Sequence, residues 1–461
     1  MARRIQALGL FVFGLIGCGT QNPSPLLQDG VVQRETLIPQ ERIEVYLPDP
    51  RSPVWDFRDL SNFGIRVKLF PILSVPPSEP YPITSNFKEL DLAHPAGMEL
   101  SRVRSGDLGT YRLIRFNFEK SEILVFERAT DRKPRKTYPL EAVKINPVNA
   151  EPTEVFWNKG VFSKEKSLEV RLTYRGVFSL LAEGKGASFP WVLVNSVYLE
   201  EYLYSVVASE IFSTWPEESL KAQAVAARTY ALRQLLLARL ESQNWDVDPT
   251  TRYQSYRGAK VEKPSITQAV DSVGHEVMLY GTEVIEASFS ANSGGVTCSS
   301  MECFNFVAPY LQSVPDHPEV RTAPDGSGNW VGRTDPEWGK NFLRNNNVDP
   351  NLFLGFDSLL IGPSGRTWQL TVRTQDGGSY PMARTDTKRP IVRYRSAFFK
   401  MGPIQGGATQ EVRGSGFGHG VGMSQWGAHF LARDGKSHRE ILTHYYQKIQ
   451  LMKLSEYLKR K

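Results

Sequence analysis

The stretch LEEYLYSVVASEIFSTWPEESLKAQAVAARTYALRQLLL, residues 199–237, decides the fold. It predicts a short apolar helix that ends near Glu210 and, after a break, a long helix built from good helix formers. Thr214 and Glu217 have the spacing of a capping box, and Pro216 suits the first turn, where its missing N–H costs nothing. We therefore expect a central helix, thinned by alanines, against which other elements pack closely.

Two cations, Lys221 and Arg228, lie on this long helix. Seven residues are two turns, so both side chains point the same way, about 10 Å apart along the axis. Such charges more often form a solvated face, and the spacing leaves that interpretation open. The alternative is a site in which one carboxyl group, Glu210, stands at a helix end with two cations on the helix behind it.

The composition is that of a globular protein. With 461 residues, the chain suits two to four domains and has ample length for a core. Its 41% hydrophobic and 23% charged residues are ordinary, while 30 prolines and 37 glycines favour turns and strands over a helical bundle. The net charge is +6, without a block of Lys and Arg, so we expect no nucleic-acid partner.

The first residues indicate export. Arg3 and Arg4 precede an apolar run that is too short to span a membrane. The run ends in LIGC, which resembles the lipobox of bacterial lipoproteins, where the chain is cut before a cysteine that is then lipidated. We expect residues 1–17 to be a signal peptide and Cys18 a lipid anchor; an ordinary signal peptide is the alternative. The mature chain, with a net charge of +4, would be tethered to a membrane by its lipid alone.

The rest of the chain predicts an α+β protein. Residues 18–42 are polar and broken by Pro and Gly, as in a linker. Short runs rich in Val, Ile, Leu, Phe and Tyr then predict a β-rich accessory domain over residues 43–165. Residues 166–455 predict a mixed α/β domain with the long helix at its centre and a substrate groove. Within it, the loop-rich residues 304–365 are expected to form a lid or a groove wall.

Two further cysteines, Cys298 and Cys303, lie close together. In an exported protein such a pair is most simply a disulfide, with free thiols and a metal site as alternatives. A metal site needs more ligands, and the next histidine is His317.

A glycine-rich stretch, GSGFGHGVGMSQWGAHFLARDG, covers residues 414–435. Glycine occupies every second position from 414 to 422, a pattern that belongs to neither strand nor helix and lets the backbone approach a ligand closely. His419 lies in the middle, and Ser424 and Gln425 follow where a helix is expected to begin. A flexible turn with a structural histidine and a binding site both fit this pattern.

Together these stretches resemble the SpoIID/LytB family of bacterial cell-wall proteins. The matching pieces occur in the family's order across roughly residues 168–450, and residues 43–165 lie outside them. They are YRGVFSLLAEG, LEEYLYSVVASE, STWPEESLKAQAVAARTYAL, YQSYRG, EASFSANSGGVT, PYLQSVPD and GSGFGHGVGMSQWGA. The resemblance implies a lytic transglycosylase that acts on peptidoglycan glycan strands already stripped of their stem peptides by an N-acetylmuramoyl-L-alanine amidase.

The resemblance also implies roles for individual residues. The family's essential acid falls on Glu210. Ser290 stands where the family usually has a histidine, from which some members appear to build a zinc site with nearby Cys and His residues. We therefore expect no metal and no other cofactor. Ala208 and Trp426 replace the family's usual Pro and Tyr. The remaining site residues of the family fall on Lys221, Arg228, His419, Ser424 and Gln425.

The chemistry fits a single acid. Glycosidic cleavage needs a proton for the leaving oxygen, and hydrolases add a second carboxylate that activates water or forms a covalent intermediate. A transglycosylase can use one, because the C6 hydroxyl of muramic acid attacks C1 while one Glu first gives and then takes a proton. The sequence offers no obvious second acid beside Glu210. A nearby cation would lower the pKa of that acid, so we assign Lys221 and Arg228 to the lactyl carboxylates of stripped muramic acid.

The other expected contacts are with sugar. Ser424 and Gln425 would hydrogen-bond hydroxyl or N-acetyl groups, and Trp215 or Trp426 could stack on a sugar face or belong to the core. Two other functions stay open: a non-catalytic glycan-binding module or amidase enhancer, and a structural lipoprotein that tethers wall to membrane. The expected location is the periplasmic face of the envelope, at the outer membrane where the cell has two membranes.

Overall fold

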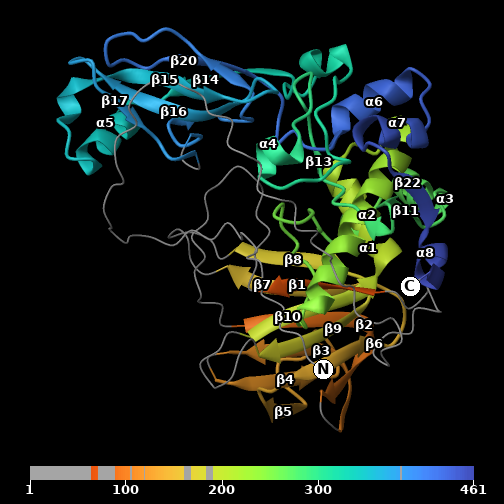
Figure 1. Ribbon diagram of the computed structural model, residues 1–461. Coiled ribbons are helices and arrows are strands. Elements are labelled where there is room, and N and C mark those ends of the chain that lie inside the picture. The colour runs from red at the N-terminus through yellow and green to blue at the C-terminus, as the bar shows by residue number, and fades with distance from the viewer. Residues whose placement is uncertain are drawn as a thin grey trace, which may run out of the picture. The chain divides into compact units, whose positions relative to one another are not determined.

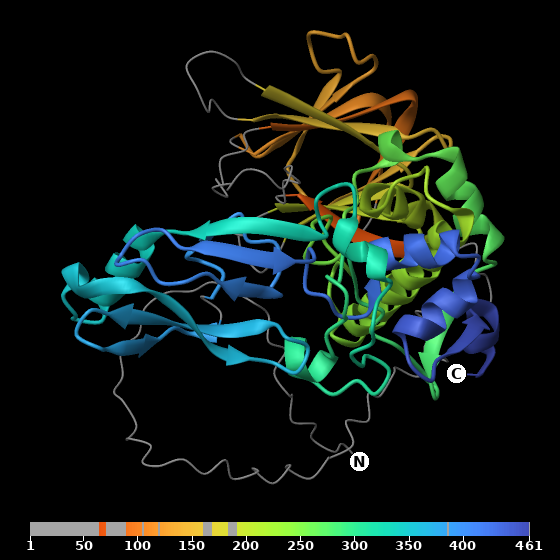
Figure 2. The same ribbon diagram turned by 90° about the horizontal axis from the view of Figure 1, so that it is seen from above.

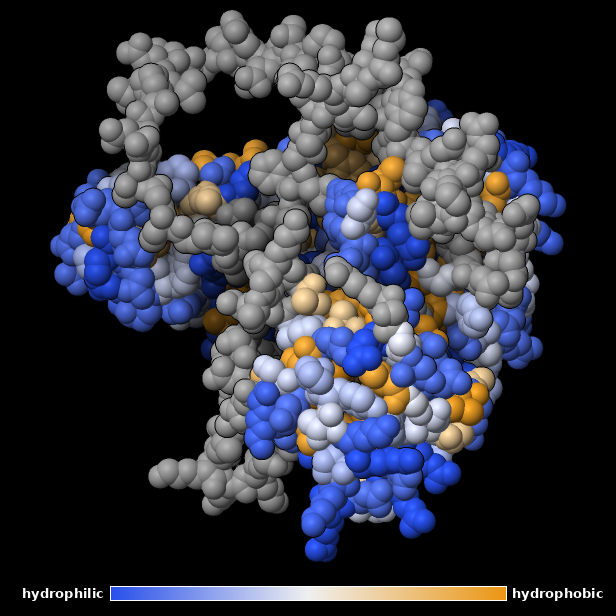
Figure 3. Space-filling model, turned by 90° about the horizontal axis from the view of Figure 1, so that it is seen from below, coloured by the Kyte–Doolittle hydropathy of each residue, from blue (hydrophilic) through white to orange (hydrophobic). Residues whose placement is uncertain are grey.

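The computed structural model describes residues 64–70, 89–103, 106–118, 120–159, 168–182, 191–384 and 387–460. The expected signal peptide, the Cys18 lipidation site and the linker lie outside these residues. The described chain is a mixed α+β structure, in which an antiparallel sheet is followed by helices and several small sheets (Figure 1). Within the described ranges, no helix is long and apolar enough to cross a membrane. On the face drawn in Figure 3, hydrophilic residues cover most of the coloured surface, with hydrophobic residues in small groups between them.

The first ten strands form one antiparallel sheet. They are β1 (Gly64–Phe70), β2 (Glu89–Arg102), β3 (Asp107–Asn117), β4 (Glu122–Phe126), β5 (Lys136–Pro139), β6 (Val143–Pro147), β7 (Thr153–Lys159), β8 (Leu168–Tyr174), β9 (Val177–Ala182) and β10 (Trp191–Tyr198). Their order is β1-β10-β9-β6-β2-β3-β4-β5, and β7 pairs with both β2 and β8. The sheet therefore continues across residue 165, where we expected a domain boundary, because β8–β10 pair with earlier strands.

The sheet leads directly into the two helices expected from the opening stretch. β10 is followed without a break by α1 (Leu199–Glu210), and a turn separates α1 from α2 (Glu217–Leu240). Most of α2 is buried, because it packs against α1, α3, α6, α7 and β11 (Figure 1). These last four elements are α3 (Pro264–Ser272), α6 (Gln425–Arg433), α7 (His438–Tyr445) and β11 (Glu276–Tyr280). The thin, alanine-rich helix is thus the element around which the others pack.

The capping box expected at the start of α2 is wrong. Pro216 occupies the N-cap position, and no side chain caps the helix. The Trp215 N–H donates to the carbonyl of Phe212 over 3.1 Å, which forms a tight turn directly before the helix. Thr214 is exposed within that turn, so its hydroxyl is not at the N-cap. By contrast, a full capping box does open α7, between the N-cap Ser437 and Glu440.

The remaining elements form small sheets and short helices. A second hydrophobic core lies among β14–β20 and α5, which appear in cyan and blue in Figure 2. Two of its strands fall within residues 304–365, where we expected loops and short helices, because glycine and asparagine in β14 weaken the strand pattern. The strands are β12 (Glu283–Val284), β13 (Phe289–Ser290), β14 (Asn329–Thr334), β15 (Phe353–Ile361), β16 (Thr367–Thr374), β17 (Ser379–Pro381), β18 (Ile391–Val392), β19 (Phe399–Met401), β20 (Glu411–Ser415), β21 (Met423–Ser424) and β22 (Gln450–Lys453). The helices are α4 (Ser300–Phe304), α5 (Pro336–Asn345) and α8 (Leu454–Arg460), with 3-10 turns at Ala259–Val261, Pro318–Thr322 and Pro350–Leu352.

Candidate functional site

Glu210 is the last residue of α1. The chain leaves the helix at once, because the next residue, Ile211, has extended backbone angles. The Glu210 side chain is only partly exposed, and its Oε1 accepts a hydrogen bond from the backbone N–H of Ser255 over 2.8 Å. A carboxyl group is thus presented at a helix end and held by a segment that lies 45 residues further along the chain.

That segment, YQSYRG at residues 253–258, is anchored at several points. The Tyr256 hydroxyl donates to Oδ1 of Asn195 on β10 over 2.9 Å. Gln254 accepts a hydrogen bond from the Tyr202 hydroxyl of α1 over 3.2 Å and donates one to a backbone carbonyl of α2 over 3.2 Å. Because these side chains are buried, the loop is fixed to the sheet and to both helices, and the position of Ser255 follows.

Gln425 reaches the same carboxyl from a distant part of the chain. It is the first residue of α6, and its side chain lies close enough to Glu210 to lower the pKa of that carboxyl. Its amide also lies 3.4 Å from Oε1 of Gln223 on α2. The structure therefore brings together two of the site residues expected from the sequence, Glu210 and Gln425.

The surroundings of Glu210 favour its protonated form. Burial raises the pKa of the Glu210 carboxyl, and the Ser255 N–H, the Arg257 charge and the Gln425 amide offset part of this effect. The net pKa lies above the usual value. A carboxyl group with a raised pKa can keep a proton nearer to neutral pH and deliver it, which is what a general acid must do.

Two other acids lie in the neighbourhood of the Tyr230 ring, as Glu210 does. Both Glu286 and Asp248 act on the pKa of Tyr230, together with Glu210. Each is already engaged: Glu286 pairs with Arg233 over 3.0 Å, and Asp248 accepts from the Thr250 N–H over 2.8 Å. Glu286 is thus held by an ion pair, and Asp248 by hydrogen bonds from Thr250, two residues further along the chain.

Arg228 does not face a groove, and the substrate role expected for it is wrong. It is completely buried, and its guanidinium makes a two-pronged pair with Glu200 of α1, at 2.9 and 2.6 Å. The same guanidinium also donates to the carbonyls of Val270 and Glu276. At the position of Arg228, this side of α2 packs against α1, α3 and β11.

Lys221 is also engaged within the protein. Its ammonium pairs with Glu217 and Glu218 of its own helix, at 2.7 and 2.9 Å. Glu218 in turn accepts from the backbone N–H of His438, the first residue of α7. This network ties the start of α2 to the start of α7, so the structure supports a structural role for Lys221.

Ser424 is buried at the N-terminus of α6. Its hydroxyl accepts hydrogen bonds from the backbone N–H groups of Gly427 and Ser293, over 3.3 and 3.2 Å. The first of these caps the helix. With 1% of its surface exposed, Ser424 positions Gln425 rather than touching a sugar, which corrects our expectation.

The glycine-rich loop packs against the rest of the domain through positions that tolerate no side chain. A Cβ at Gly420 would collide with the buried guanidinium of Arg366, and one at Gly422 with the carbonyl of Ser288. His419, directly before Gly420, is exposed, and its Nδ1 accepts from the Val421 N–H over 3.0 Å. Its described contacts lie with this loop and with α4, not with Glu210.

The comparisons with known proteins fit this arrangement. A family model described as Stage II sporulation protein matches residues 190–280, which hold α1, α2 and the YQSYRG loop. Stage II sporulation protein D of Bacillus subtilis is 32% identical over 282 residues, covering 58% of this chain and 78% of that protein. The chain belongs to the stage II sporulation protein D family. The resemblance seen in the motifs is therefore confirmed.

Two further relatives extend the comparison. A protein of Brachyspira hyodysenteriae is 33% identical over 262 residues, which is 57% of this chain and 68% of that protein. The amidase enhancer of Bacillus subtilis is 26% identical over 289 residues, which is 53% of this chain and 39% of the enhancer. The stage II sporulation protein D family thus includes a relative that is named for its effect on an amidase.

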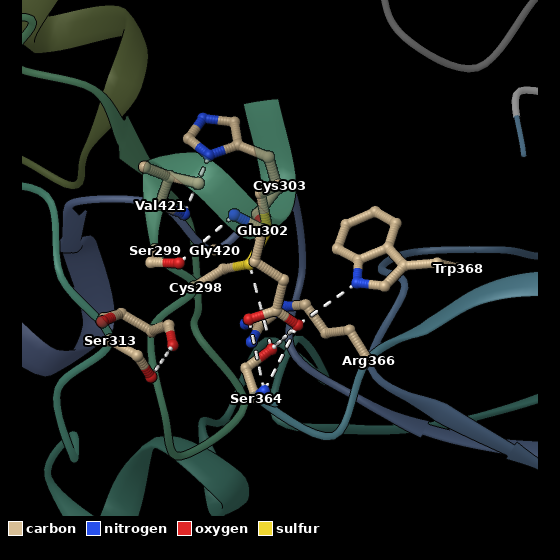
Figure 4. Close-up of a disulfide and its surroundings, with 12 residues drawn as sticks. Cys298, Ser299, Glu302, Cys303, Ser313, Ser364, Arg366, Trp368, Gly420 and Val421 are labelled. Atoms are coloured by element: carbon tan, nitrogen blue, oxygen red, sulfur yellow. Dashed lines mark hydrogen bonds between the residues drawn. A yellow bond between two sulfur atoms is a disulfide. The ribbon is translucent and has the colours of Figure 1, made fainter. Parts of the chain in front are cut away.

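In this member of the stage II sporulation protein D family, Cys298 and Cys303 form a disulfide, with their Cα atoms 6.1 Å apart (Figure 4). It joins the C-terminal end of α4 to Cys298, which forms a β-bridge with Val421 of the glycine-rich loop. Beside it, Glu302 accepts from Ser364 and from the Trp368 indole over 3.2 Å (Figure 4). The disulfide therefore links α4 to the segment that pairs with the glycine-rich loop.

A zinc site does not fit these residues. Cys298 and Cys303 are joined in the disulfide, and Ser290 has no imidazole that could bind zinc. Over the described ranges, no group of three or more His, Cys, Asp or Glu side chains could hold a metal ion. Zinc is ordinarily bound by imidazole nitrogens and cysteine thiolates, and both of these cysteines are held in the disulfide.

Aromatic rings from the turn after α1 and from α6 gather together. Trp426 is 5% exposed, and its indole N–H donates to Asp325 over 2.9 Å, so its ring belongs to the core. Trp215 is partly exposed and lies 4.8 Å from Trp426, centre to centre. Phe212, two residues after Glu210, is 55% exposed and 5.5 Å from the Trp215 ring. Of the two tryptophans expected to stack on sugar, only Trp215 keeps an accessible ring, and the exposed ring of Phe212 lies next to it.

Sequence reasoning missed three residues of this site: Ser255, Arg257 and Phe212. The signal for the first two was present in YQSYRG, which matches the family but received no role. Phe212 had no pattern to mark it, because a single apolar residue in a turn is common and its exposure depends on tertiary packing.

Proposed function

We propose that this protein is a peptidoglycan lytic transglycosylase with Glu210 as its acid and base. The observation that carries the proposal is the partly buried Glu210 carboxyl, whose pKa is raised and whose Oε1 accepts from the Ser255 N–H, with Gln425 close by. The substrate would be a glycan strand, with Phe212 and Trp215 offering ring faces to its sugars. The expected anchor at Cys18 would place the enzyme on the periplasmic side of the envelope, beside the cell wall.

The reaction balances with this one carboxyl group. Protonated Glu210 gives its proton to the oxygen between muramic acid and the next glucosamine, and the C1–O bond breaks as positive charge builds on the sugar. The glucosamine leaves with a free 4-hydroxyl. The C6 hydroxyl of the same muramic acid then bonds to C1 and gives its proton to the Glu210 carboxylate. The product is a 1,6-anhydro end, water is not consumed, and Glu210 is protonated again.

The neighbouring acids support this route over hydrolysis. A retaining hydrolase needs a second carboxylate as nucleophile, and an inverting one needs it as a base for water. Glu286 and Asp248 are both engaged with protein groups, as described above. The C6 hydroxyl removes the need for either.

A second function, amidase enhancement without cleavage, is favoured by the similarity to the amidase enhancer of Bacillus subtilis. Such a protein could keep the glycan-binding surface while acting on a partner amidase. The raised pKa of Glu210 favours catalysis, because a purely binding surface has no use for a carboxyl group whose pKa is raised.

The test is product analysis by mass spectrometry, with peptide-free glycan strands and the protein lacking residues 1–18. We expect products with 1,6-anhydro-muramic acid ends, absent with Glu210→Gln and present with Glu217→Gln, which changes an exposed carboxylate on α2. Reducing ends would mean a hydrolase. Binding of the strands without any cleavage would support the enhancer.

A further inference from the structure

A glycan stripped of its peptides carries a free lactyl carboxylate on each muramic acid, so a site for it should offer a cation. The two cations first assigned to this task are engaged elsewhere: Arg228 is buried against Glu200, and Lys221 pairs within α2. The charge that recognises the carboxylate must therefore come from another element near Glu210.

Arg257 has the required position. It stands two residues after Ser255, whose N–H binds Glu210, and its own charge acts on the pKa of Glu210. Ser255 contacts both groups, because its N–H donates to Glu210 over 2.8 Å and its Oγ accepts from Arg257 Nε over 3.2 Å. The guanidinium is therefore within reach of a substituent on a sugar bound at the acid.

The Arg257 backbone is fixed while its side chain stays accessible. The backbone N–H donates to Ser205 Oγ of α1 over 3.1 Å, and the following Gly258 lies so close to the Thr173 carbonyl that no side chain would fit there. The residue itself is exposed. Its Nε donates to Ser255 Oγ over 3.2 Å, which leaves the two terminal NH₂ groups of the fork for a ligand.

The carboxylates around this loop do not occupy Arg257. Glu262 and Glu201, which both act on neighbouring Tyr256, pair instead with Arg175, at 2.8 and 4.0 Å. Arg257 makes no ion pair with a carboxylate among the described residues. An exposed, unpaired guanidinium beside a candidate acid is a typical docking point for an anionic group, because its planar fork matches a carboxylate.

We propose that Arg257 binds the lactyl carboxylate of the muramic acid at the cleavage point, and so makes the site specific for strands without stem peptides. This rests on the proposed function, because it names the group that the same site reads on its glycan. In an intact strand the carboxylate is an amide, which has no charge for the guanidinium to pair with. Arg257 is then the residue that distinguishes stripped strands from intact ones.

Binding at Arg257 also acts on the acid. The guanidinium lowers the pKa of Glu210, and a carboxylate bound to it would offset that charge. The bound substrate would thereby help Glu210 to keep its proton until the glycosidic oxygen takes it. Recognition of a stripped sugar and protonation of the acid are coupled through one side chain.

The test measures binding in a Glu210→Gln background, so that turnover is not needed. Calorimetric titration compares peptide-free strands that have free lactyl carboxylates with the same strands after conversion of these groups to methylamides. We expect the free carboxylate to strengthen binding about tenfold, and Arg257→Gln to abolish this preference. Arg252→Gln is the matched control, because it removes an exposed arginine from the same loop and should keep the preference.

Each outcome decides the matter. Equal binding of both strands by the parent protein would overturn the proposal without any substitution at Arg257. A preference that persists in Arg257→Gln, or one that disappears in Arg252→Gln as well, would overturn it too. If Arg257→Gln does not fold, Arg257→Lys takes its place, and we expect a reduced preference because an ammonium pairs with one point rather than two. If the wild-type protein cleaves no strands, the proposed transglycosylase activity is overturned. The binding test of Arg257 can still be carried out, because it does not need cleavage.

Discussion

The backbone N–H of Ser255 lies 2.8 Å from Oε1 of Glu210 and connects a loop to the end of a helix 45 residues earlier. Both ends of this contact are held firmly. Glu210 is at the end of α1, which follows directly from β10, and the loop is tied to β10 through Tyr256 and Asn195. One strand of the large sheet thus positions the candidate acid and the loop that carries its partners. The ten-stranded sheet therefore helps to position the candidate site.

Glu210→Gln should change activity and stability in opposite directions. Loss of the acid should lower the cleavage rate by about 10²–10⁴-fold, since glutamine cannot donate a carboxylic proton. Burial raises the pKa of Glu210, so the ionised carboxylate at pH 7 costs folding free energy, which lessens as the pH falls and the group takes up a proton. The neutral amide avoids that cost. Thermal unfolding at pH 7 should show a variant at least as stable as wild type; a less stable variant would contradict this assignment of the charge.

The pH profile should report the Glu210 pKa. Cleavage needs protonated Glu210, so kcat/KM should fall as pH rises through the raised pKa. The Arg257 charge lowers that pKa, so Arg257→Gln should move the basic limb of the profile to higher pH while raising KM. Rates measured between pH 4 and pH 9 check this, with Arg252→Gln expected to leave the limb in place. A shift to lower pH would mean that Arg257 does not act on the acid.

Arg228→Met should destabilise the fold rather than act on substrate binding. It leaves the carboxylate of Glu200 partly buried without its main partner, which typically costs about 3–5 kcal/mol. The matched control is Arg135→Met, which removes an exposed pair with Glu127 and should cost at most about 1 kcal/mol. Denaturant unfolding of both variants measures the difference. Equal stability of the two, with cleavage lost in Arg228→Met, would restore the substrate role.

The same pair predicts the response to acid. Burial raises the pKa of Glu200, but Arg228 and His275 outweigh it and bring the pKa down to about 2. A carboxylate whose pKa is lower in the folded state stabilises the fold above its unfolded value near 4.5, and this stabilisation is lost as pH falls towards 2. The free energy of unfolding should fall over that interval in wild type. The fall should be smaller in Arg228→Met.

Gly422→Ala should damage the glycine-rich loop. Gly422 has a φ of +72°, and a Cβ there would collide with the Ser288 carbonyl, so we expect a loss of about 3 kcal/mol or more. Gly435→Ala is the control, because Gly435 has a φ of +84° with open space around its Cβ position, and should cost about 1 kcal/mol. Unfolding curves compare the two. Similar losses of stability in the two variants would mean that the positive φ, and not the contact with Ser288, requires glycine at position 422.

The sequence by itself determined the local elements of the site. Helix formers, a break and a second helix predict α1 and α2 within a residue or two, because periodicity and propensity act over short distances. The motifs identified the family and placed Glu210 at a helix end. They also marked the glycine-rich loop, since glycine at alternate positions excludes regular structure.

Tertiary structure decided which face of each element is accessible. The seven-residue spacing puts Lys221 and Arg228 on one side of α2, yet Arg228 is buried against α1, α3 and β11. Its guanidinium therefore forms an internal ion pair with Glu200. Conversely, Arg257 carries no periodic pattern and comes to lie beside Glu210 through contacts between distant segments. Periodicity shows which residues share a face, but only the packing of remote elements shows what that face meets. The candidate acid was therefore visible in the sequence, and its surroundings were not.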